Sequence, residues 1–439
     1  MTASESQGSA PQKPVEAATP LMCVLALLPV LLHVVGLVVS AMRQDAFQFR
    51  KLDLAVSLVV VAYLCVAGIA LRSRERTIRF LLVSYSALIA IGTFEVFAVL
   101  SGVAARPGSV PWPPLRWVWL AGNTVPGVKG KVVFSVNDIG LRGPKIALRK
   151  AAVKILCVGG STTECLYVSD KQSWPWLLGT QLSRTTDQLV FVGNAGKSGN
   201  FTLHHEYILS QYDYADQFDW IVMLCGINDA GTLLRGNYEE RAKRVPAEAL
   251  VVAKSDGAYY RHSAIAYLIE RLTRPKPDPE ADVAQDPMGD WYANVRRKRE
   301  DALARNTIRT MPPGLSTAIA RYRENLTRIV KLCKRRNQNL LLLTQPALYH
   351  ANMSAELSDL IWQHTDAGAY TPEILERVIH EYNCALMAVC REQRVEYIDL
   401  AALLPKDTSI FYDDCHFNVS GCKRVADILT EYFTQMLEK

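Results

Sequence analysis

Hydrophobic residues are spread unevenly along the chain, and the first hundred positions hold three long apolar runs. They cover Leu21–Met42, Leu54–Leu71 and Phe80–Leu100. Runs of about 20 apolar residues are long enough to cross a bilayer as helices. A soluble helical hairpin is the alternative, but helices that are apolar on all faces have no polar side to meet water. The pattern predicts a membrane anchor of about three transmembrane helices over residues 21–105, after a disordered tail at residues 1–20.

Basic residues between the apolar runs indicate the orientation of this anchor. The second loop carries Arg72, Arg74, Arg76 and Arg79 and the N-terminal tail carries Lys13, whereas the first loop carries Arg43, Arg50 and Lys51. Loops rich in Lys and Arg tend to stay in the cytoplasm, so the N-terminus is expected there too. A poor basic region before the first run argues against a cleaved signal peptide. The predicted localisation is a cell inner membrane, with several spans and the C-terminal domain outside the cytoplasm.

Glu95 stands inside the third apolar run and is open to two interpretations. An ionisable group within a span is a functional candidate by default. Near the end of a helix, however, its carboxylate can reach water at the membrane interface. We favour the second interpretation because Glu95 lies so close to the end of the run.

From about residue 152, short apolar strands alternate with amphipathic helices. Strands are predicted at Val153–Val158, Leu189–Val192, Trp220–Leu224, Leu340–Leu343 and Val395–Ile398. Helices are predicted at Ser173–Ser183, Ile319–Val330, Ile374–Glu392 and Val419–Leu437. This order predicts an α/β fold with a central parallel sheet of about five strands and helices on both faces. In such sheets the active site lies at the carboxyl ends of the strands.

Two segments depart from this alternation. Residues 106–150 begin with a Pro-rich linker and continue into a Gly- and Val-rich stretch, Gly127–Gly143, which predicts a small β-ribbon. Within the domain at 151–439, residues 233–313 are charged and Pro-containing, which predicts a mostly helical insertion over one edge of the active-site face. Its run Arg296–Arg299 could contact an anionic substrate, although a solvated helix face is the simpler interpretation.

Composition narrows the classes of function. The net charge of +6 gives no reason to expect a nucleic acid as partner. The ten cysteines are scattered and form no CxxC pair, so neither a disulfide framework nor a zinc site is predicted. Cys415 and Cys422 could pair if the domain lies in an oxidising compartment. No metal or other cofactor is expected.

Residues suited to catalysis follow three of the predicted strands and precede the last helix. The first strand ends in Gly159-Gly160-Ser161, the second in Asn194-Ala195-Gly196 and the third in Gly226-Ile227-Asn228-Asp229. Asp413-Asp414-Cys415-His416 lies shortly before the final helix. Each alone is common turn or helix-cap chemistry. Together they lie in order along the chain and at the same edge of the predicted sheet, which favours a functional site.

This combination resembles the SGNH (GDSL-like) hydrolase family, whose four sequence blocks supply Ser, Gly, Asn and His. The resemblance covers about residues 152–437 and implies a flavodoxin-like, three-layer fold. Three further stretches are similar to membrane-anchored relatives, namely Asn137-x-x-Gly140-x-Arg142-Gly143, Leu343-Thr344-Gln345-Pro346, and Tyr382-Asn383 with Ile398-Asp399-Leu400. One departure is that Gly160 stands where the family usually has an aspartate, which removes a carboxylate near the nucleophile.

The resemblance implies a Ser-His-Asp triad. Ser161 would be the nucleophile, His416 the base that takes its proton, and Asp413 the carboxylate that orients the imidazole. Asp414 is a neighbouring candidate for the last role, but the family's three-residue spacing favours Asp413. The implied oxyanion-hole donors are the backbone N–H groups of Ser161 and Gly196 and the side-chain amide of Asn228.

The function that follows is a membrane-anchored serine ester hydrolase that removes O-acyl groups, chiefly acetyl, from an extracytoplasmic carbohydrate. Its partners would be an O-acylated glycan or other ester, the lipid bilayer and polysaccharide-assembly membrane proteins. Alternatives are an O-acetyltransferase of envelope or exported polysaccharide, a lipid esterase or thioesterase, and a non-catalytic component of a glycan-assembly complex. An apolar trough at the insertion would favour lipid esters, and an aromatic-lined polar cleft, with Trp291 and Tyr292 as candidates, would favour sugars.

Overall fold

The protein is divided into two compact units. A computed structural model describes residues 16–42, 51–100, 109–143, 148–252, 263–273 and 286–437. The first unit comprises Met1–Arg106 with Lys254–Lys276, and the second comprises Pro107–Ala253 with Pro277–Lys439. The predicted disordered tail at residues 1–20 falls mainly outside the described residues.

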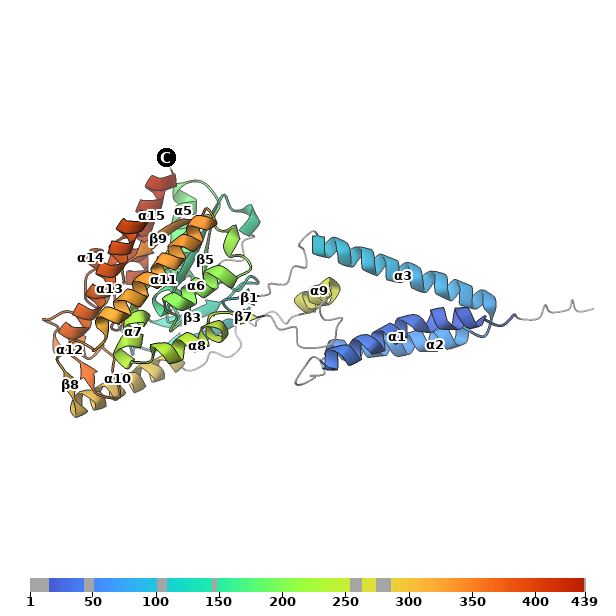
Figure 1. Ribbon diagram of the computed structural model, residues 1–439, viewed down its shortest axis with the longest axis horizontal. Coiled ribbons are helices and arrows are strands. Elements are labelled where there is room, and N and C mark those ends of the chain that lie inside the picture. Colours follow the sequence, from blue (N-terminus) through green and yellow to red (C-terminus); the bar gives the residue numbers. More distant parts are fainter. Residues whose placement is uncertain are drawn as a thin grey trace, which may run out of the picture. The chain divides into compact units, whose positions relative to one another are not determined.

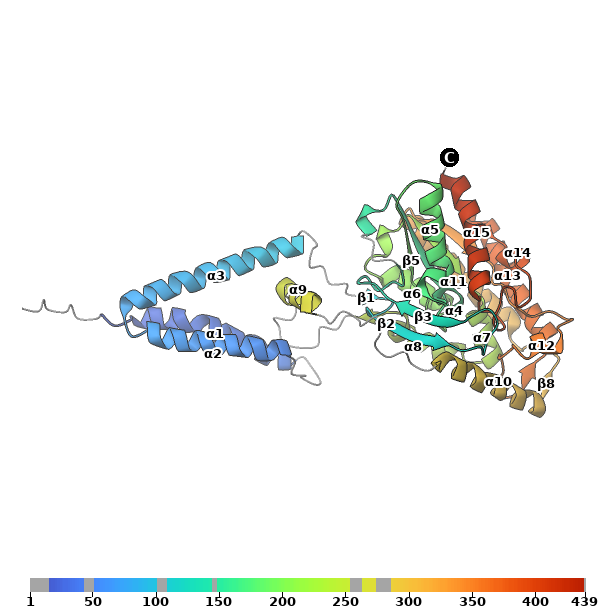
Figure 2. The ribbon, with the colours of Figure 1, turned by 180° about the vertical axis from the view of Figure 1, so that it is seen from behind.

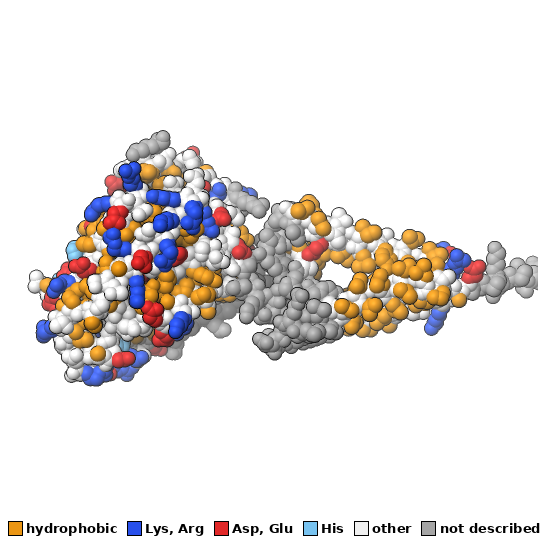
Figure 3. All heavy atoms as spheres, in the orientation of Figure 1, with side chains coloured by type: hydrophobic (Ala, Val, Ile, Leu, Met, Phe, Trp, Pro, Cys, Tyr) orange, Lys and Arg blue, Asp and Glu red, His pale blue; other side chains and the backbone are white. Residues whose placement is uncertain are grey.

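The first unit is helical. It contains α1 (Pro20–Met42), α2 (Lys51–Ala70), α3 (Arg74–Leu100) and α9 (Ala264–Thr273) (Figure 1). Among the described residues, two helices have stretches long and apolar enough to cross a membrane, Pro20–Leu37 and Arg74–Ala98, and almost none of either stretch is buried. Apolar side chains cover much of the surface of these helices (Figure 3). The apolar stretch of α2, Val56–Ala70, is shorter, so the structure supports two candidate spans where the sequence predicted about three.

Glu95 has a role that neither interpretation of the sequence included. Its carboxylate on α3 accepts hydrogen bonds from the backbone N–H groups of Ala264 and Ile265, the latter at 3.1 Å. These residues open α9, where the first N–H groups of a helix lack intrahelical partners. A carboxylate at this position also interacts favourably with the helix dipole. Glu95 therefore caps a helix that lies about 170 positions away in the sequence.

The second unit is built on a five-stranded parallel sheet. Its spatial order is β11-β9-β6-β4-β5. The strands are β4 (Val153–Gly159), β5 (Val190–Asn194), β6 (Trp220–Leu224), β9 (Asn339–Leu343) and β11 (Glu396–Ile398). Numbered along the chain this is the order 2-1-3-4-5, as in flavodoxin-like sheets, with its switch point between β4 and β6. The predicted parallel sheet of about five strands is confirmed.

Helices cover both faces of this sheet. Figure 1 shows α6 (Thr202–Gln211), α11 (Leu315–Arg335) and α13 (Pro372–Gln393) on the near face, and Figure 2 shows α5 (Trp174–Thr185) and α15 (Val419–Leu437) on the opposite face. Side chains alternate along the strands, so Leu156 and Val158 pack towards α11 and α13, while Ile155 and Cys157 pack towards α5 and α15. Burial on both faces explains why the strands are continuous apolar runs.

Smaller elements surround the sheet. The β-ribbon pairs β2 (Arg116–Ala121) with β3 (Gly130–Ser135), so it begins earlier than the predicted stretch at Gly127–Gly143. Two short pairs join β1 (Ser109–Val110) to β7 (Val251–Val252) and β8 (Thr307–Ile308) to β10 (Ala369–Tyr370). The remaining α-helices are α4 (Ser161–Glu164), α7 (Ile227–Arg235), α8 (Tyr238–Ala249), α10 (Pro287–Arg305), α12 (Ala355–Ser358) and α14 (Leu400–Leu403).

The basic run on α10 does not form one solvated face. Arg299 is buried, and its guanidinium donates to the carbonyl oxygens of Gln363 and Tyr370, the latter at 3.0 Å. Arg296 donates to the Thr124 carbonyl oxygen at 3.4 Å. These contacts join α10 to β10, to the loop before it and to the turn of the ribbon. Arg296 and Arg299 therefore hold neighbouring segments together.

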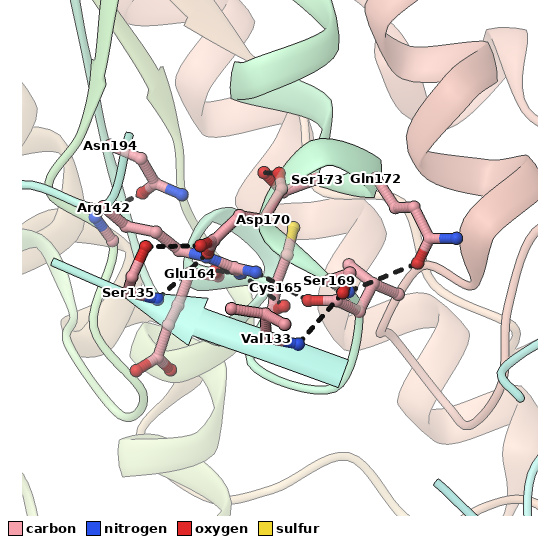
Figure 4. A network of polar contacts seen from close by, with 12 residues as sticks. Val133, Ser135, Arg142, Glu164, Cys165, Ser169, Asp170, Gln172, Ser173 and Asn194 are labelled. Atoms are coloured by element: carbon pink, nitrogen blue, oxygen red, sulfur yellow. Dashed lines mark hydrogen bonds and ion pairs between the residues drawn. The ribbon is translucent and has the colours of Figure 1, made fainter. Parts of the chain in front are cut away.

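Arg142 connects the segment after the ribbon to the end of α4 and the loop beyond it (Figure 4). Its side chain is buried, and Nε donates to Asp170 Oδ1 at 2.9 Å. Its two terminal nitrogens donate to the carbonyl oxygens of Glu164, Cys165 and Val168, the last two at 2.6 Å each. Those carbonyls belong to the end of α4 and the loop beyond it, and among the described residues only that of Cys165 also accepts a backbone N–H, from Val168 at 3.2 Å. Arg142 thus holds the short helix that begins at Ser161.

We expect Arg142→Ala to destabilise the second unit by about 3–5 kcal/mol, because it leaves the Asp170 carboxylate and several carbonyls buried without their donor. Urea denaturation of the full-length chain in detergent measures the change. The matched control is Arg323→Ala, which breaks the exposed pair with Glu392 and should cost no more than about 1 kcal/mol. Equal small losses for both variants would contradict the assigned role of Arg142.

Candidate active site

The turn between β4 and α4 requires a residue without a side chain at position 160. A Cβ atom on Gly160 would lie 2.3 Å from Asn228 Nδ2 and 3.1 Å from the Asn200 carbonyl oxygen. The first of these separations is far below van der Waals contact, so this geometry does not accommodate an aspartate. The departure from the family pattern therefore goes with a close approach of the Asn228 amide to the backbone that carries Ser161.

The structure brings Ser161, Asp413 and His416 together. His416 Nε2 lies 2.7 Å from Ser161 Oγ, and His416 Nδ1 lies 2.6 Å from Asp413 Oδ2. Ser161 is the first residue of α4, directly after β4, and the Asp413–His416 segment lies just before α15. Both distances are those of hydrogen bonds. The three groups form one continuous chain from a carboxylate through an imidazole to a hydroxyl.

Asp413 and its neighbour Asp414 have different partners. Asp413 Oδ1 accepts the backbone N–H groups of Cys415 and His416 at 3.0 and 2.8 Å, and Asp413 Oδ2 accepts Trp362 Nε1 at 3.2 Å besides the imidazole. Asp414 points elsewhere, and its Oδ2 accepts the Tyr349 hydroxyl at 2.8 Å. Of the two carboxylates, Asp413 is the one in contact with the imidazole.

The pKa values of Asp413 and Asp414 are shifted in opposite directions. Burial would raise the pKa of Asp413, but the charge and hydrogen bond of His416 outweigh it and hold this pKa below its usual value. Burial followed by the charge of Asp413 raises the pKa of Asp414 to about 7. Burial also opposes the charging of His416, yet Asp413 outweighs it and raises the pKa of the imidazole above 6.5. The pair is thus arranged to stabilise an imidazolium when one forms.

Two aromatic rings lie parallel to the imidazole of His416. The Tyr412 ring is 5.5 Å away with an interplanar angle of 10°, and the Trp362 ring is 6.4 Å away with an angle of 15°. Trp362 also donates to Asp413, so it contacts both partners of the hydrogen bond. These contacts restrict rotation of the imidazole, which keeps Nε2 directed at Ser161.

The predicted oxyanion-hole donors are placed differently from one another. Asn228 lies in the first turn of α7, and its amide donates one hydrogen to the Asn200 carbonyl oxygen at 2.9 Å. The N–H of Gly196 is directed at Asn194 Oδ1, 2.8 Å away, so this donor is already used within its own turn. Gly199 instead lines the cavity beside Ser161 and Asn228, with a positive φ of 81°. In the described part of the chain, the N–H groups of Ser161 and Gly199 donate to no protein acceptor.

A cavity of about 600 Å³ opens over these groups. Ser161, Asn228 and His416 line it together with the aromatic residues Trp291 and Tyr292 of α10. Both were named from the sequence as candidate cleft residues. Trp362 and Tyr412 complete the aromatic part of the wall, and α7 and α8 contribute Arg235, Arg241 and Arg244.

The cysteines are arranged differently from the predicted pairing. Cys422 Sγ lies 3.9 Å from Cys165 Sγ, whereas Cys415 Sγ lies beside His416, 3.6 Å from Nδ1. Cys415 and Cys422 form no disulfide in this structure. All ten cysteines are free thiols in this structure. Cys165 ends α4, so the closest thiol pair joins the helix of Ser161 to the helix after His416.

The Asp413–His416 segment also gathers four potential metal-ligand atoms within 4.8 Å of one another. Two of these residues already use each other, because His416 Nδ1 is hydrogen-bonded to Asp413. Cys415 has a pKa raised well above its usual value by burial, which disfavours the thiolate that binds metals. The ligand atoms of this segment therefore suit the hydrogen bond between Asp413 and His416 better than they suit a metal ion.

Sequence reasoning missed Gly199, Trp362 and the three cavity arginines. A signal for Gly199 was available, since Ser198-Gly199-Asn200 is a second turn-forming stretch that begins two residues after Gly196. Trp362 lies in a loop after α12 with no periodic pattern around it. The arginines stand in the charged segment that begins at α7, where they look like an ordinary solvated helix face.

Comparisons with known proteins identify a matching family and several similar solved structures. The family model for the GDSL-like lipase/acylhydrolase family matches residues 157–424. Similar solved structures include LAE5, an α/β hydrolase enzyme from the metagenome of Lake Arreo, Spain, at 13% identity and a TM-score of 0.36. Another is Axe2, an acetylxylan esterase from Geobacillus stearothermophilus, at 13% identity and a TM-score of 0.35. Each match covers 64% of this chain and 94% of the other.

A search of curated proteins finds no significant match. The family model nevertheless spans well over half of the chain and includes the segments that carry Ser161, Asn228 and His416. The chain belongs to the GDSL-like lipase/acylhydrolase family and is an SGNH-type hydrolase of carboxylic esters.

Proposed function

We propose that the protein hydrolyses esters by a serine mechanism in which Ser161 is the nucleophile, His416 the general base and Asp413 its orienting carboxylate. The observation that carries this proposal is the hydrogen-bonded chain from Asp413 through His416 to Ser161 Oγ, with contacts of 2.6 and 2.7 Å. A serine hydroxyl becomes an effective nucleophile when a base within hydrogen-bond reach takes its proton. The proximity of all three groups supports each assigned role.

The reaction proceeds in two halves. His416 Nε2 accepts the Ser161 proton as Oγ attacks the ester carbonyl carbon, and the imidazolium then returns that proton to the departing alcohol oxygen. This leaves an acyl group on Ser161. In the second half, His416 deprotonates a water molecule that attacks the acyl carbon, and the carboxylic acid leaves as Ser161 regains its proton. Asp413 stabilises the imidazolium in both halves.

We assign the oxyanion hole to the backbone N–H groups of Ser161 and Gly199 and to the side-chain amide of Asn228. Gly199 replaces Gly196 in this assignment because the Gly196 N–H is bonded to Asn194. The N–H groups of Ser161 and Gly199 lack acceptors among the described residues, and both residues line the cavity with Asn228. Donors fixed in advance at the site of developing negative charge stabilise the transition state without reorganising.

The substrate we propose is an O-acylated, chiefly O-acetylated, carbohydrate. Four aromatic side chains line the cavity beside polar and charged groups, whereas Leu166 is the one aliphatic side chain among the described residues that line it. Broad rings with polar edges suit a sugar, whose C–H groups can pack on a ring face while its hydroxyls find polar partners. A long acyl chain would be better served by a trough of aliphatic side chains. Because so few aliphatic side chains line the cavity, a short acyl group is favoured over a long one.

We propose further that the helical unit anchors the chain in a cell inner membrane, with the catalytic unit outside the cytoplasm. Exposed Leu, Val and Ile side chains along α1 and α3 support this placement, since a soluble unit would bury them. Arg72, Arg74, Arg76 and Arg79 favour a cytoplasmic location for the loop between α2 and α3. A domain held there would be near envelope glycans and the membrane proteins that assemble them.

The first test is hydrolysis of p-nitrophenyl acetate by the full-length chain in detergent. We expect turnover in the wild type and a loss of at least about 10³-fold in kcat for Ser161→Ala, because the nucleophilic oxygen is absent. The control is Ser198→Ala, which removes another hydroxyl from the cavity wall. This hydroxyl donates to Glu164 and makes no contact with His416, so the variant shows how much kcat falls when a hydroxyl outside the triad is lost. Full activity in Ser161→Ala would rule out the mechanism.

The pH profile tests the role of Asp413. Neutral His416 is the form that accepts the Ser161 proton, so kcat/KM should be high above the raised pKa of His416 and fall as the pH drops through it. Asp413→Asn removes the charge that raises this pKa. We therefore expect the acid limb to move to lower pH while kcat falls by about 10⁴-fold. An acid limb that stays in place would exclude Asp413 as the partner of His416.

Asn228 offers a test of the oxyanion hole. We expect Asn228→Ala to lower kcat by about 10²–10³-fold with little change in KM, because the amide is needed most when charge develops. Asn228→Asp keeps the shape of the side chain but replaces a donor with an acceptor, and should lower kcat at least as much. Steady-state kinetics on p-nitrophenyl acetate give both values. A change confined to KM would assign Asn228 to ground-state binding instead.

A further inference from the structure

The active-site cavity carries an excess of positive charge. Fourteen described residues line it, and they include Arg235, Arg241 and Arg244 but no aspartate or glutamate. All three arginines come from the segment that runs from the end of α7 through α8. Clefts lined by one sign of charge concentrate ligands of the opposite sign. The lining alone therefore favours an anion over a neutral ligand.

Nearby carboxylates compensate this charge in part. Glu248 is shared between Arg244, at 3.1 Å, and Arg241, at 3.9 Å, and Glu240 lies 3.7 Å from Arg244. Lys197 adds another positive charge in the same region, since its Nζ donates to the Glu248 carbonyl oxygen at 2.6 Å. Buried Glu164 and Asp229 add attraction for Lys197 and Arg241. Carboxylates therefore compensate Lys197, Arg241 and Arg244, whereas Arg235 has none facing it among the described residues.

Arg235 has no carboxylate partner among the described residues. It is exposed to solvent at the end of α7, and its guanidinium folds back over Gly231, where a Cβ atom would lie 2.8 Å from Nη2. Glycine at position 231 leaves room for this placement on the cavity wall. The fork of a guanidinium matches the two oxygens of a carboxylate, so an unpaired arginine here is suited to bind one from a ligand.

Polar and aromatic groups in the same wall indicate what carries the anion. Asn237, between Arg235 and Arg241 in the sequence, has a buried side-chain oxygen that accepts no hydrogen bond from the described residues. A ligand hydroxyl would supply the missing donor. Trp291 and Trp362, with ring centroids 5.7 Å apart, add broad apolar faces beside it. Hydroxyls, a ring and a carboxylate are the features of an acidic sugar.

We propose that this cavity binds an O-acylated glycan bearing carboxylates, of the uronic acid type, with Arg235 as the main carboxylate receptor and Arg241 and Arg244 supporting it. The proposal rests on the proposed function for the identity of the ester bond, but the binding of the charged glycan can be measured without any turnover. Arg235 is the residue to vary because it makes no hydrogen bond that other parts of the site need. Arg241, by contrast, donates to the Gly199 carbonyl oxygen at 2.7 Å.

The experiment is calorimetric binding to the full-length Ser161→Ala chain in detergent, so that neither probe is consumed. The probes are a short oligogalacturonate and its methyl ester, which differ in charge but share the sugar backbone. We expect the acid to bind at least about tenfold more tightly at low salt, with an advantage that shrinks as ionic strength rises. Adding Arg235→Gln should reduce the preference to within about twofold.

Arg184→Gln is the matched control, since it removes an exposed arginine at the end of α5 that does not line the cavity. It should retain the preference for the acid. Equal binding of acid and ester, or a preference that survives Arg235→Gln, would overturn the proposal. Glycerol 3-phosphate is a third probe, and tighter binding of it than of the oligogalacturonate would assign the arginines to a lipid headgroup instead.

The binding results can be distinguished from the test of the proposed function. If the wild type does not hydrolyse p-nitrophenyl acetate, the serine mechanism is refuted, but the preference for the acidic probe is unaffected. Equal binding of the two galacturonate probes would refute the acidic-sugar assignment while hydrolysis of the neutral ester continued. Thermal denaturation of each variant distinguishes a loss of binding from a loss of fold.

Discussion

The buried guanidinium of Arg142 is the contact on which the geometry of the site depends. Helix α4 is a single turn, too short to be stable by itself, and its terminal carbonyls face the protein interior. Arg142 bonds those carbonyls, and its backbone pairs with Asn194 at the end of β5. One residue therefore connects the strand end that precedes Gly199 with the turn that carries Ser161. Its salt bridge with Asp170 keeps this buried charge paired.

A second constraint is that two adjacent buried carboxyl groups are not both easily ionised. Asp413 and Asp414 are adjacent and both fully buried, and only Asp413 has a cationic partner in the imidazole. The pKa of Asp414 is raised to about 7, first by burial and then by Asp413, so near neutral pH this carboxyl group is partly protonated. Its hydrogen bond to Tyr349 suits a structural role. Asp413, the carboxylate that we propose for catalysis, is therefore distinguished from Asp414 by its environment as much as by its spacing.

Sequence reasoning succeeded where a physical pattern was strong and local. The five strands were predictable because burial on both faces makes them continuous apolar runs. Ser161, Asn228 and His416 were proposed from the resemblance to a family together with their expected place at one edge of the sheet, and the structure brings Ser161 and His416 within hydrogen-bond distance. Gly199 was missed because the direction of a backbone N–H depends on torsion angles that residue types do not reveal. The capping contact of Glu95 was missed because its partner helix, α9, is distant in sequence. The cavity arginines have the same spacing as a solvated helix face, and only the fold shows which side they line.

Helix α7 explains how recognition of charge and stabilisation of the oxyanion can be coupled. Asn228 stands in its first turn, where the positive end of the helix dipole favours the developing negative charge. Arg235 ends the same helix, but its guanidinium reaches back over Gly231, which is about one turn, or 5 Å, from Asn228. A carboxylate held by Arg235 would therefore lie close to the reacting ester. Because both groups belong to one rigid helix, binding the charged sugar would fix the ester carbonyl relative to its oxyanion donor, which is how binding energy is converted into rate.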